Sequence, residues 1–146
     1  MKIDKIDSSN YPSLIKIWEA SVRATHDFLN EDDITFLKPL ILEKYFDAVD
    51  LRCAKDDAGI ILGFIGMADK NIEMLFISPN HMGKGIGAFL TNNAIQKQGA
   101  TKVDVNEQNP QAVGFYEHLG FKVISRSATD GQGKPFPLLH MELNNI

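Results

Sequence analysis

The chain has 146 residues, 44% of them apolar, which is enough to build the core of one ordinary globular domain covering residues 1–146. A formal net charge of −4 argues against a general nucleic-acid or anionic-membrane surface, and no apolar run approaches the roughly 20 residues that cross a bilayer. The N-terminus has no signal-peptide pattern and the chain has one cysteine, Cys53, so we expect a cytoplasmic protein.

Apolar periodicity and turn residues predict the elements in chain order. Helices are expected from Tyr11 with Leu14, Ile15, Trp18 and Val22 on one face, from about 32 to 47, from the glycine turn at 83–87 to Gly99, and from 109 to 120. Strands are expected at 3–6, 51–55, 60–68, 72–77, 101–105, 121–127 and 138–143. Pro39 lies inside the second helix, where a missing N–H favours a kink or a break.

The helix at 109–120 has the clearest boundaries. Asn109 is a good N-cap, Pro110 fits the first turn, and Gly120 follows the last. The predicted order is β-α-α-β-β-β-α-β-α-β-β, which indicates an α/β protein with a mixed sheet and covering helices.

The segment Met82-Gly83-Lys84-Gly85-Ile86-Gly87-Ala88 lies between a predicted strand and a predicted helix. Glycines there expose backbone N–H groups at a helix N-terminus, an arrangement that binds phosphate oxygens. A P-loop would need Ser or Thr after Gly83-Lys84, and Gly85 stands there instead. A dinucleotide fingerprint, Gly83-x-Gly85-x-x-Ala88 followed by Asp104, fits the letters, but too little chain follows for a second nucleotide-binding half.

Two blocks together resemble the GNAT family of acetyl-CoA-dependent N-acetyltransferases. The glycine turn is similar to the family pattern Q/R-x-x-G-x-G/A, and 109–121 is similar to N-x-x-A-x-x-F-Y-x-x-x-G-F, with Asn109, Ala112, Phe115, Tyr116, Gly120 and Phe121 matching. The element order extends the resemblance over nearly the whole chain. One position departs from the pattern, since Met82 replaces the polar or cationic residue, and Lys84 supplies some of the missing charge.

The resemblance implies a cofactor site for acetyl-CoA. Phe76 and Ile77 would bind the pantetheine arm, and Asn109 and Tyr116 would also contact the cofactor. The diphosphate would be bound by the turn residues Met82, Gly83, Lys84, Gly85, Ile86, Gly87 and Ala88. The resemblance also places the acceptor near the first inter-helix loop, with His26 and Asp27 as substrate-binding candidates.

Acetyl transfer to an amine needs a group to accept a proton and another to protonate the leaving thiolate. Tyr116 is the candidate acid, because a phenol is neutral at pH 7 and can donate. Glu73 is the candidate base, and alternation would put it on the face opposite Ile72 and Met74. Three of these candidates have a structural alternative. Tyr116 could simply pack on the apolar face of its helix, Asn109 could simply cap that helix, and Glu73 could simply face solvent.

Other polar residues favour structural roles. The acids Glu31, Asp32 and Asp33 fit a helix start, His140 fits a structural position, and Cys53 reads as an inert buried thiol. The four histidines are not at metal-ligand spacing with Cys53, so no metal is expected.

The sequence thus predicts an N-acetyltransferase that moves the acetyl group directly in a ternary complex, to a small-molecule amine or a lysine-bearing protein or peptide. No nucleic-acid or membrane partner is expected, and monomer and homodimer both stay open. The alternative is a non-catalytic module that senses acyl-CoA.

Overall fold

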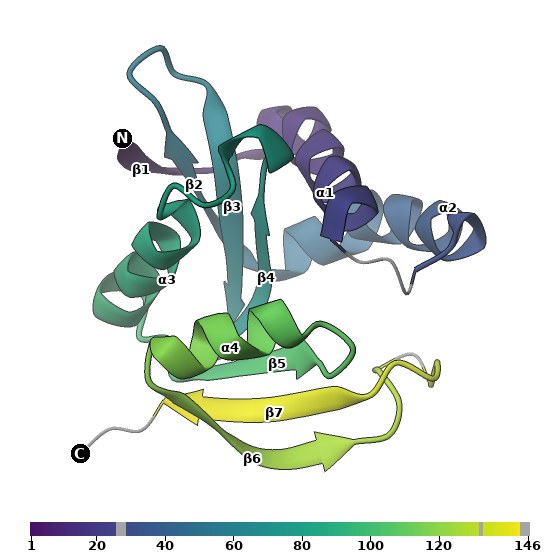
Figure 1. Ribbon diagram of the computed structural model, residues 1–146. Coiled ribbons are helices and arrows are strands. Elements are labelled where there is room, and N and C mark those ends of the chain that lie inside the picture. The colour runs from purple at the N-terminus through teal and green to yellow at the C-terminus, as the bar shows by residue number, and fades with distance from the viewer. Residues whose placement is uncertain (26–28, 132, 144–146) are drawn as a thin grey trace.

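The computed structural model describes residues 1–25, 29–131 and 133–143. These residues include a seven-stranded sheet in the order β1-β2-β3-β4-β5-β7-β6 (Figure 1). Neighbouring strands are antiparallel except β4 and β5, which are parallel. The strands are β1 (Lys2–Lys5), β2 (Asp50–Lys55), β3 (Ile61–Ala68), β4 (Asn71–Ile77), β5 (Lys102–Asn106), β6 (Phe121–Ser127) and β7 (Leu138–Leu143).

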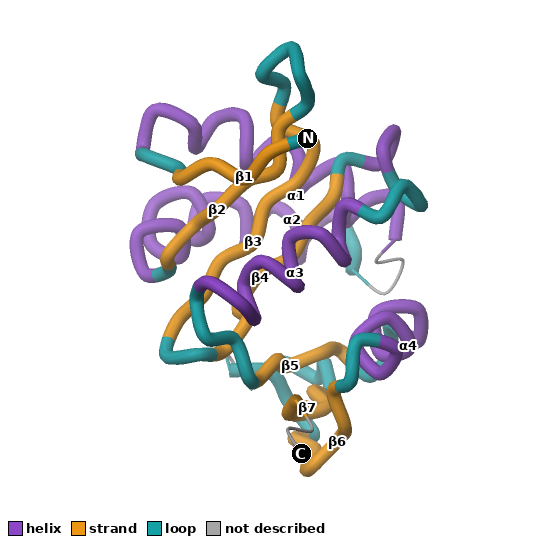
Figure 2. The backbone as a smooth tube through the Cα atoms, turned by 90° about the vertical axis from the view of Figure 1, so that its left-hand side faces the viewer, coloured by secondary structure: helices purple, strands orange, loops and turns teal. Residues whose placement is uncertain are grey.

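The helices cover the two faces of the sheet, as Figures 1 and 2 show. They are α1 (Tyr11–Thr25), α2 (Glu31–Leu40), α3 (Ile86–Lys97) and α4 (Pro110–His118), with short turns at Ser8–Asn10 and Pro79–His81. Apolar side chains of α1 and α2 pack with Phe64 and Cys53 in one core, while those of α3 and α4 pack with Ile65 and Ile72 in the other. The expected α/β architecture is confirmed, and no helix in the described ranges is long and apolar enough to cross a membrane.

The second helix differs from its prediction after Pro39. Regular α2 ends at Leu40, a π-helical turn spans Ile41–Tyr45, and a 3-10 turn spans Phe46–Ala48. Proline has no N–H for the i−4 carbonyl, so the helix loses one bond and the next turn widens. The predicted interruption is therefore confirmed, although the chain remains helical throughout this span.

The two central parallel strands pair only at their beginnings. The register of β4 and β5 consists of Asn71 opposite Lys102 and Ile72 opposite Val103, and no ladder pairing continues beyond that point. Both strands run on, β4 to Ile77 and β5 to Asn106. They therefore splay apart, and the opening lies at the middle of the sheet.

A β-bulge at Glu73 lies where the splay begins. On β3, Gly66 and Met67 are consecutive, whereas their partners on β4 are Met74 and Ile72, so Glu73 is the extra residue. A bulge shifts the alternation of side chains by one position. Ile72 consequently packs with α3 and α4, and Met74 packs with α1 and α2. The prediction that Ile72 and Met74 share a face was wrong for this reason.

Several structural expectations are confirmed. Trp18 and Cys53 are buried, and burial raises the pKa of the Cys53 thiol. Asn30 caps α2, because its Oδ1 accepts from the Asp33 N–H at 2.9 Å while the Asp33 carboxylate accepts from the Asn30 N–H at 3.1 Å. Glu31 is paired with Arg23. The acids at the start of α2 therefore cap and charge the helix, as their sequence indicated.

Candidate active site

The glycine turn forms a row of exposed amides ahead of α3. Gly83 and Gly85 adopt left-handed backbone angles, with φ of 78° and 80°, and a Cβ at either position would meet no atom within 4 Å. Gly85 is the N-cap of α3 and provides no side-chain cap. Within the described residues, the N–H groups from Gly83 to Ala88 donate no hydrogen bond. This row of donors, with the positive end of the α3 dipole behind it, fits a diphosphate.

Gly87 has a different task from the other two glycines. A Cβ there would lie 3.3 Å from Cζ of Phe115, so the absence of a side chain lets α3 approach α4. The glycine turn and α4 are thereby held against each other. The two sequence blocks, 83–88 and 109–121, meet at this contact.

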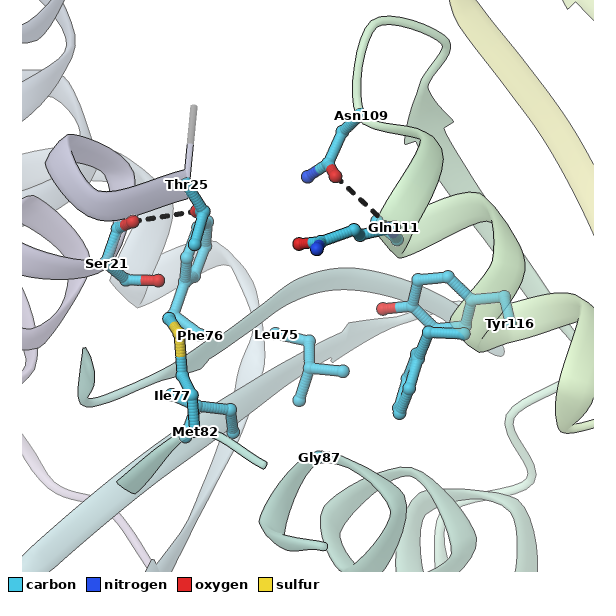
Figure 3. Close-up of a pocket in the computed structure, with 12 residues that line it drawn as sticks. Ser21, Thr25, Leu75, Phe76, Ile77, Met82, Gly87, Asn109, Gln111 and Tyr116 are labelled. Carbon is cyan, nitrogen blue, oxygen red and sulfur yellow. Dashed lines mark hydrogen bonds between the residues drawn. The ribbon is translucent and has the colours of Figure 1, made fainter. Parts of the chain in front are cut away.

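A pocket of about 240 Å³ opens beside the turn, and we name it the front pocket (Figure 3). Residues from α1, β4, the turn and α4 line it: Ser21, Thr25, Leu75, Phe76, Ile77, Met82, Gly87, Asn109, Gln111, Ala112, Phe115 and Tyr116. The pocket is mostly apolar, with the amide row at one end. That shape suits a long flexible ligand with an anionic group.

A second cavity, which we name the splay pocket, lies between β4 and β5 and has a volume of about 140 Å³. It is lined by Ile72, Glu73, Met74, Leu75, Phe76, Val103, Asp104, Val105, Asn106, Asn109, Ala112 and Tyr116. Leu75 and Val105 belong to the core under α3 and α4, whereas Met74 and Phe76 belong to the core under α1 and α2. The splay pocket therefore connects the two faces of the sheet.

Tyr116 stands in the wall that the two pockets share. Its ring packs edge-on against Phe115 and Phe121, with centroids 5.0 Å and 5.6 Å away, and the residue is 6% exposed. Figure 3 shows its hydroxyl pointing into the front pocket, and no hydrogen-bond partner for this hydroxyl is found among the described residues. Burial raises the pKa of Tyr116, so the phenol stays protonated at neutral pH. Packing and a chemical role are thus compatible at this position.

The structure brings most of the remaining predicted residues to the same place. Asn109 lines both pockets and also caps α4, since its Oδ1 accepts from the Ala112 N–H at 3.2 Å. Met82 is 38% exposed and lines the front pocket, while Lys84 is exposed and makes no ion pair in the described chain. Glu73 lines the splay pocket with an exposed side chain.

Two of the predicted site residues are not described by the structure, and three residues that line the front pocket were not predicted. His26 and Asp27 lie outside the described residues, directly after α1. Ser21 and Thr25, one turn apart on α1, and Gln111 on α4 line the front pocket but carried no motif. The only sequence signal was that Ser21 interrupts the apolar face of α1 beside Val22. In the described part of the chain, no group of three or more His, Cys, Asp or Glu side chains could hold a metal ion.

The family model for the acetyltransferase (GNAT) domain matches residues 30–144. The chain belongs to the GNAT acetyltransferase family. It is an enzyme that transfers acetyl groups to amines, as its relatives in this family are named to do. The non-catalytic sensor is not favoured.

Two relatives within the GNAT family are similar to this chain over most of their length. The peptidyl-lysine N-acetyltransferase YjaB of Salmonella typhimurium is 41% identical over 128 residues, which cover 88% of both chains. YjaB of Escherichia coli is 40% identical over 128 residues, covering 88% of this chain and 86% of the relative.

Solved structures of the GNAT fold superpose closely. The solution structure of apo YjaB from Escherichia coli has a TM-score of 0.90 at 36% identity, covering 99% of this chain and 98% of that one. A PaiA N-acetyltransferase from Thermoplasma acidophilum, solved in complex with coenzyme A, has a TM-score of 0.76 at 21% identity, with 98% of both chains covered. The latter likeness concerns the fold alone.

Proposed function

We propose that this chain acetylates lysine side chains of proteins or peptides, using acetyl-CoA, as a single cytoplasmic domain. Two relatives that are about two-fifths identical carry the name peptidyl-lysine N-acetyltransferase. The observation that carries the proposal is the position of Tyr116, whose protonated hydroxyl enters a pocket that joins the amide row to the splay of the sheet.

In this proposal the front pocket holds acetyl-CoA. The free amides of Gly83, Lys84, Gly85, Ile86, Gly87 and Ala88 bind the diphosphate, with Met82 beside them in the pocket wall. The Lys84 ammonium adds positive charge. The pantetheine arm follows β4 at Phe76 and Ile77, opposite Asn109. This path leads the thioester to Tyr116.

The acceptor amine reaches the thioester through the splay pocket from the face of α1 and α2. An alkylammonium with an ordinary pKa near 10.4 is almost fully charged at pH 7, so one proton must leave before the nitrogen attacks. Glu73 takes that proton, directly or through water. As the carbon–sulfur bond breaks, Tyr116 donates its proton to the sulfur and regains one from the acetylated nitrogen.

His26 and Asp27, which follow α1 in the sequence, belong to the same proposal. We assign them to contacts with the acceptor, because α1 ends at Thr25, and Thr25 lines the front pocket in which the acceptor meets the thioester. Cys53 takes no part, since it is fully buried outside both pockets and its pKa is raised. Transfer is therefore direct, without an acetylated enzyme.

The test follows acetyl transfer to a lysine peptide, to the same peptide with arginine at that position, and to a panel of small amines. Acetylated peptide is detected by mass and free coenzyme A by thiol titration. We expect the lysine peptide to react, and Tyr116→Phe to lower kcat roughly 100-fold or more, the range of general acid–base catalysis. Tyr11→Phe is the matched control, because it removes a phenol hydroxyl that bonds to Asp47 away from both pockets.

Two outcomes would contradict the proposal. Reaction of small amines with no reaction of any lysine peptide would show that the acceptor is a small-molecule amine and not a peptidyl lysine. Binding of coenzyme A without thiol release on any amine would instead support the sensor.

A further inference from the structure

A hydrogen-bonded chain of three side chains crosses the half of the sheet formed by β5, β7 and β6. Nδ1 of His140 lies 2.6 Å from Oδ1 of Asp104, and Nε2 of His140 lies 2.6 Å from Oγ of Ser127. Asp104 and His140 are directly opposite each other in the β5–β7 register. Their neighbours Val103 and Met141 are buried under α3 and α4, so Asp104 and His140 face the other side, from which the acceptor would come.

The direction of this chain distinguishes it from a nucleophilic triad of the same composition. In such a triad the serine faces the substrate and the carboxylate is remote. Here Asp104 lines the splay pocket together with Glu73 and Tyr116, and neither His140 nor Ser127 lines it. The three hydrogen-bonded side chains therefore present the carboxylate of Asp104 to the splay pocket.

The hydrogen-bond roles follow from the donor inventory. A carboxylate only accepts, so the proton between Asp104 and His140 is on Nδ1, and in the neutral ring Nε2 accepts from the Ser127 hydroxyl. Two hydrogen bonds thus hold the imidazole, and the imidazole holds one oxygen of Asp104. The side chain of Asp104 is 40% exposed and keeps further lone pairs for another donor.

We propose that Asp104 is the anionic subsite for the ammonium of the acceptor, and that His140 is a positioning residue for it. The inference rests on the proposed function and names what selects a cationic acceptor. Asp104 accepts a charge-assisted hydrogen bond from the ammonium on one wall of the splay pocket, while Glu73 on the β4 wall takes the proton. A neutral amine can donate an N–H to the same carboxylate but lacks the attraction between opposite charges, so it gains less from this contact.

The test measures acceptor KM, kcat and coenzyme A affinity for three variants with a lysine peptide. Asp104→Asn keeps an acceptor for His140 and removes the charge, so we expect acceptor KM to rise roughly 10- to 100-fold, with kcat changed less and coenzyme A affinity unchanged. Glu142→Gln is the matched control, because it removes one charge two residues along β7 from His140 and does not line the pocket. His140→Phe should also raise KM.

His140→Asn should have an acceptor KM much closer to that of the unaltered enzyme than His140→Phe has. The reason is that the Asn side-chain nitrogen occupies the place of Nδ1 and donates to Asp104. A purely structural role would not show this rescue. Equal KM values for Asp104→Asn and Glu142→Gln would overturn the inference while leaving the proposed function intact. Absence of transfer by the unaltered enzyme would overturn both.

Discussion

The amide row can be tested by comparing one substitution at two glycines. Gly85 and Gly59 have nearly equal backbone angles, φ of 80° and 81°, and a Cβ at either would have open space around it. Alanine in the left-handed conformation costs about 1–2 kcal/mol, so Gly85→Ala and Gly59→Ala should destabilise the fold alike. For a chain of this size the loss corresponds to a fall in Tm of roughly 3–8 °C.

Binding of coenzyme A should separate the two variants. The methyl group of Gly85→Ala would stand among the free amides from Gly83 to Ala88. The methyl group of Gly59→Ala would instead lie in the turn between β2 and β3, away from these amides. Loss of one charge-assisted hydrogen bond costs about 1.5–3 kcal/mol, which weakens binding roughly 10- to 150-fold.

Isothermal titration with coenzyme A measures this directly, with thermal unfolding as the check on strain. Gly59→Ala should bind like the unaltered protein. If Gly85→Ala bound equally well while losing the same stability, the diphosphate would not lie on this turn, and the assignment of the front pocket to the cofactor would fail.

Three further predictions concern charge, burial and packing. Met82→Arg, which restores a cation at the turn, should tighten coenzyme A binding about two- to fivefold in low salt and lose that gain in high salt, as titrations at two ionic strengths would show. Burial raises the pKa of Tyr116, so above about pH 10 the unfolded chain loses a proton that the folded protein keeps. The free energy of unfolding should therefore fall as pH rises above 10, and urea titrations of Tyr116→Phe should show a smaller fall. Phe46 is fully buried and packs edge-on against Phe64 at 5.8 Å, so Phe46→Ala should cost about 3–5 kcal/mol in urea unfolding, and a loss below 1 kcal/mol would contradict that packing.

Local signals in the sequence were sufficient for most of the fold. The limits of α4 follow from Asn109, Pro110 and Gly120, each of which acts within one turn of the helix. The interruption at Pro39 has the same local origin, because one missing N–H is enough to change the turn that follows. Boundaries of this kind depend on neighbouring residues and need no tertiary contact.

The faces of β4 could not be read in the same way. Strict alternation predicts one face for Ile72 and Met74, and the bulge at Glu73 separates them. A bulge is a property of the pairing between β3 and β4, so only the register reveals it.

The sequence by itself determined the elements, the glycine turn and the acetyltransferase resemblance, because these depend on residues within one or two turns of each other. The tertiary structure decided that Tyr116 stands between two pockets and that Asp104, Ser127 and His140 meet on neighbouring strands. The physical reason is the path of the chain. The splay of β4 from β5 brings β4 and α4 to one pocket, and the insertion of β7 between β5 and β6 brings together Asp104 and His140, which are 36 positions apart. Such contacts depend on sheet order and register rather than on local propensity.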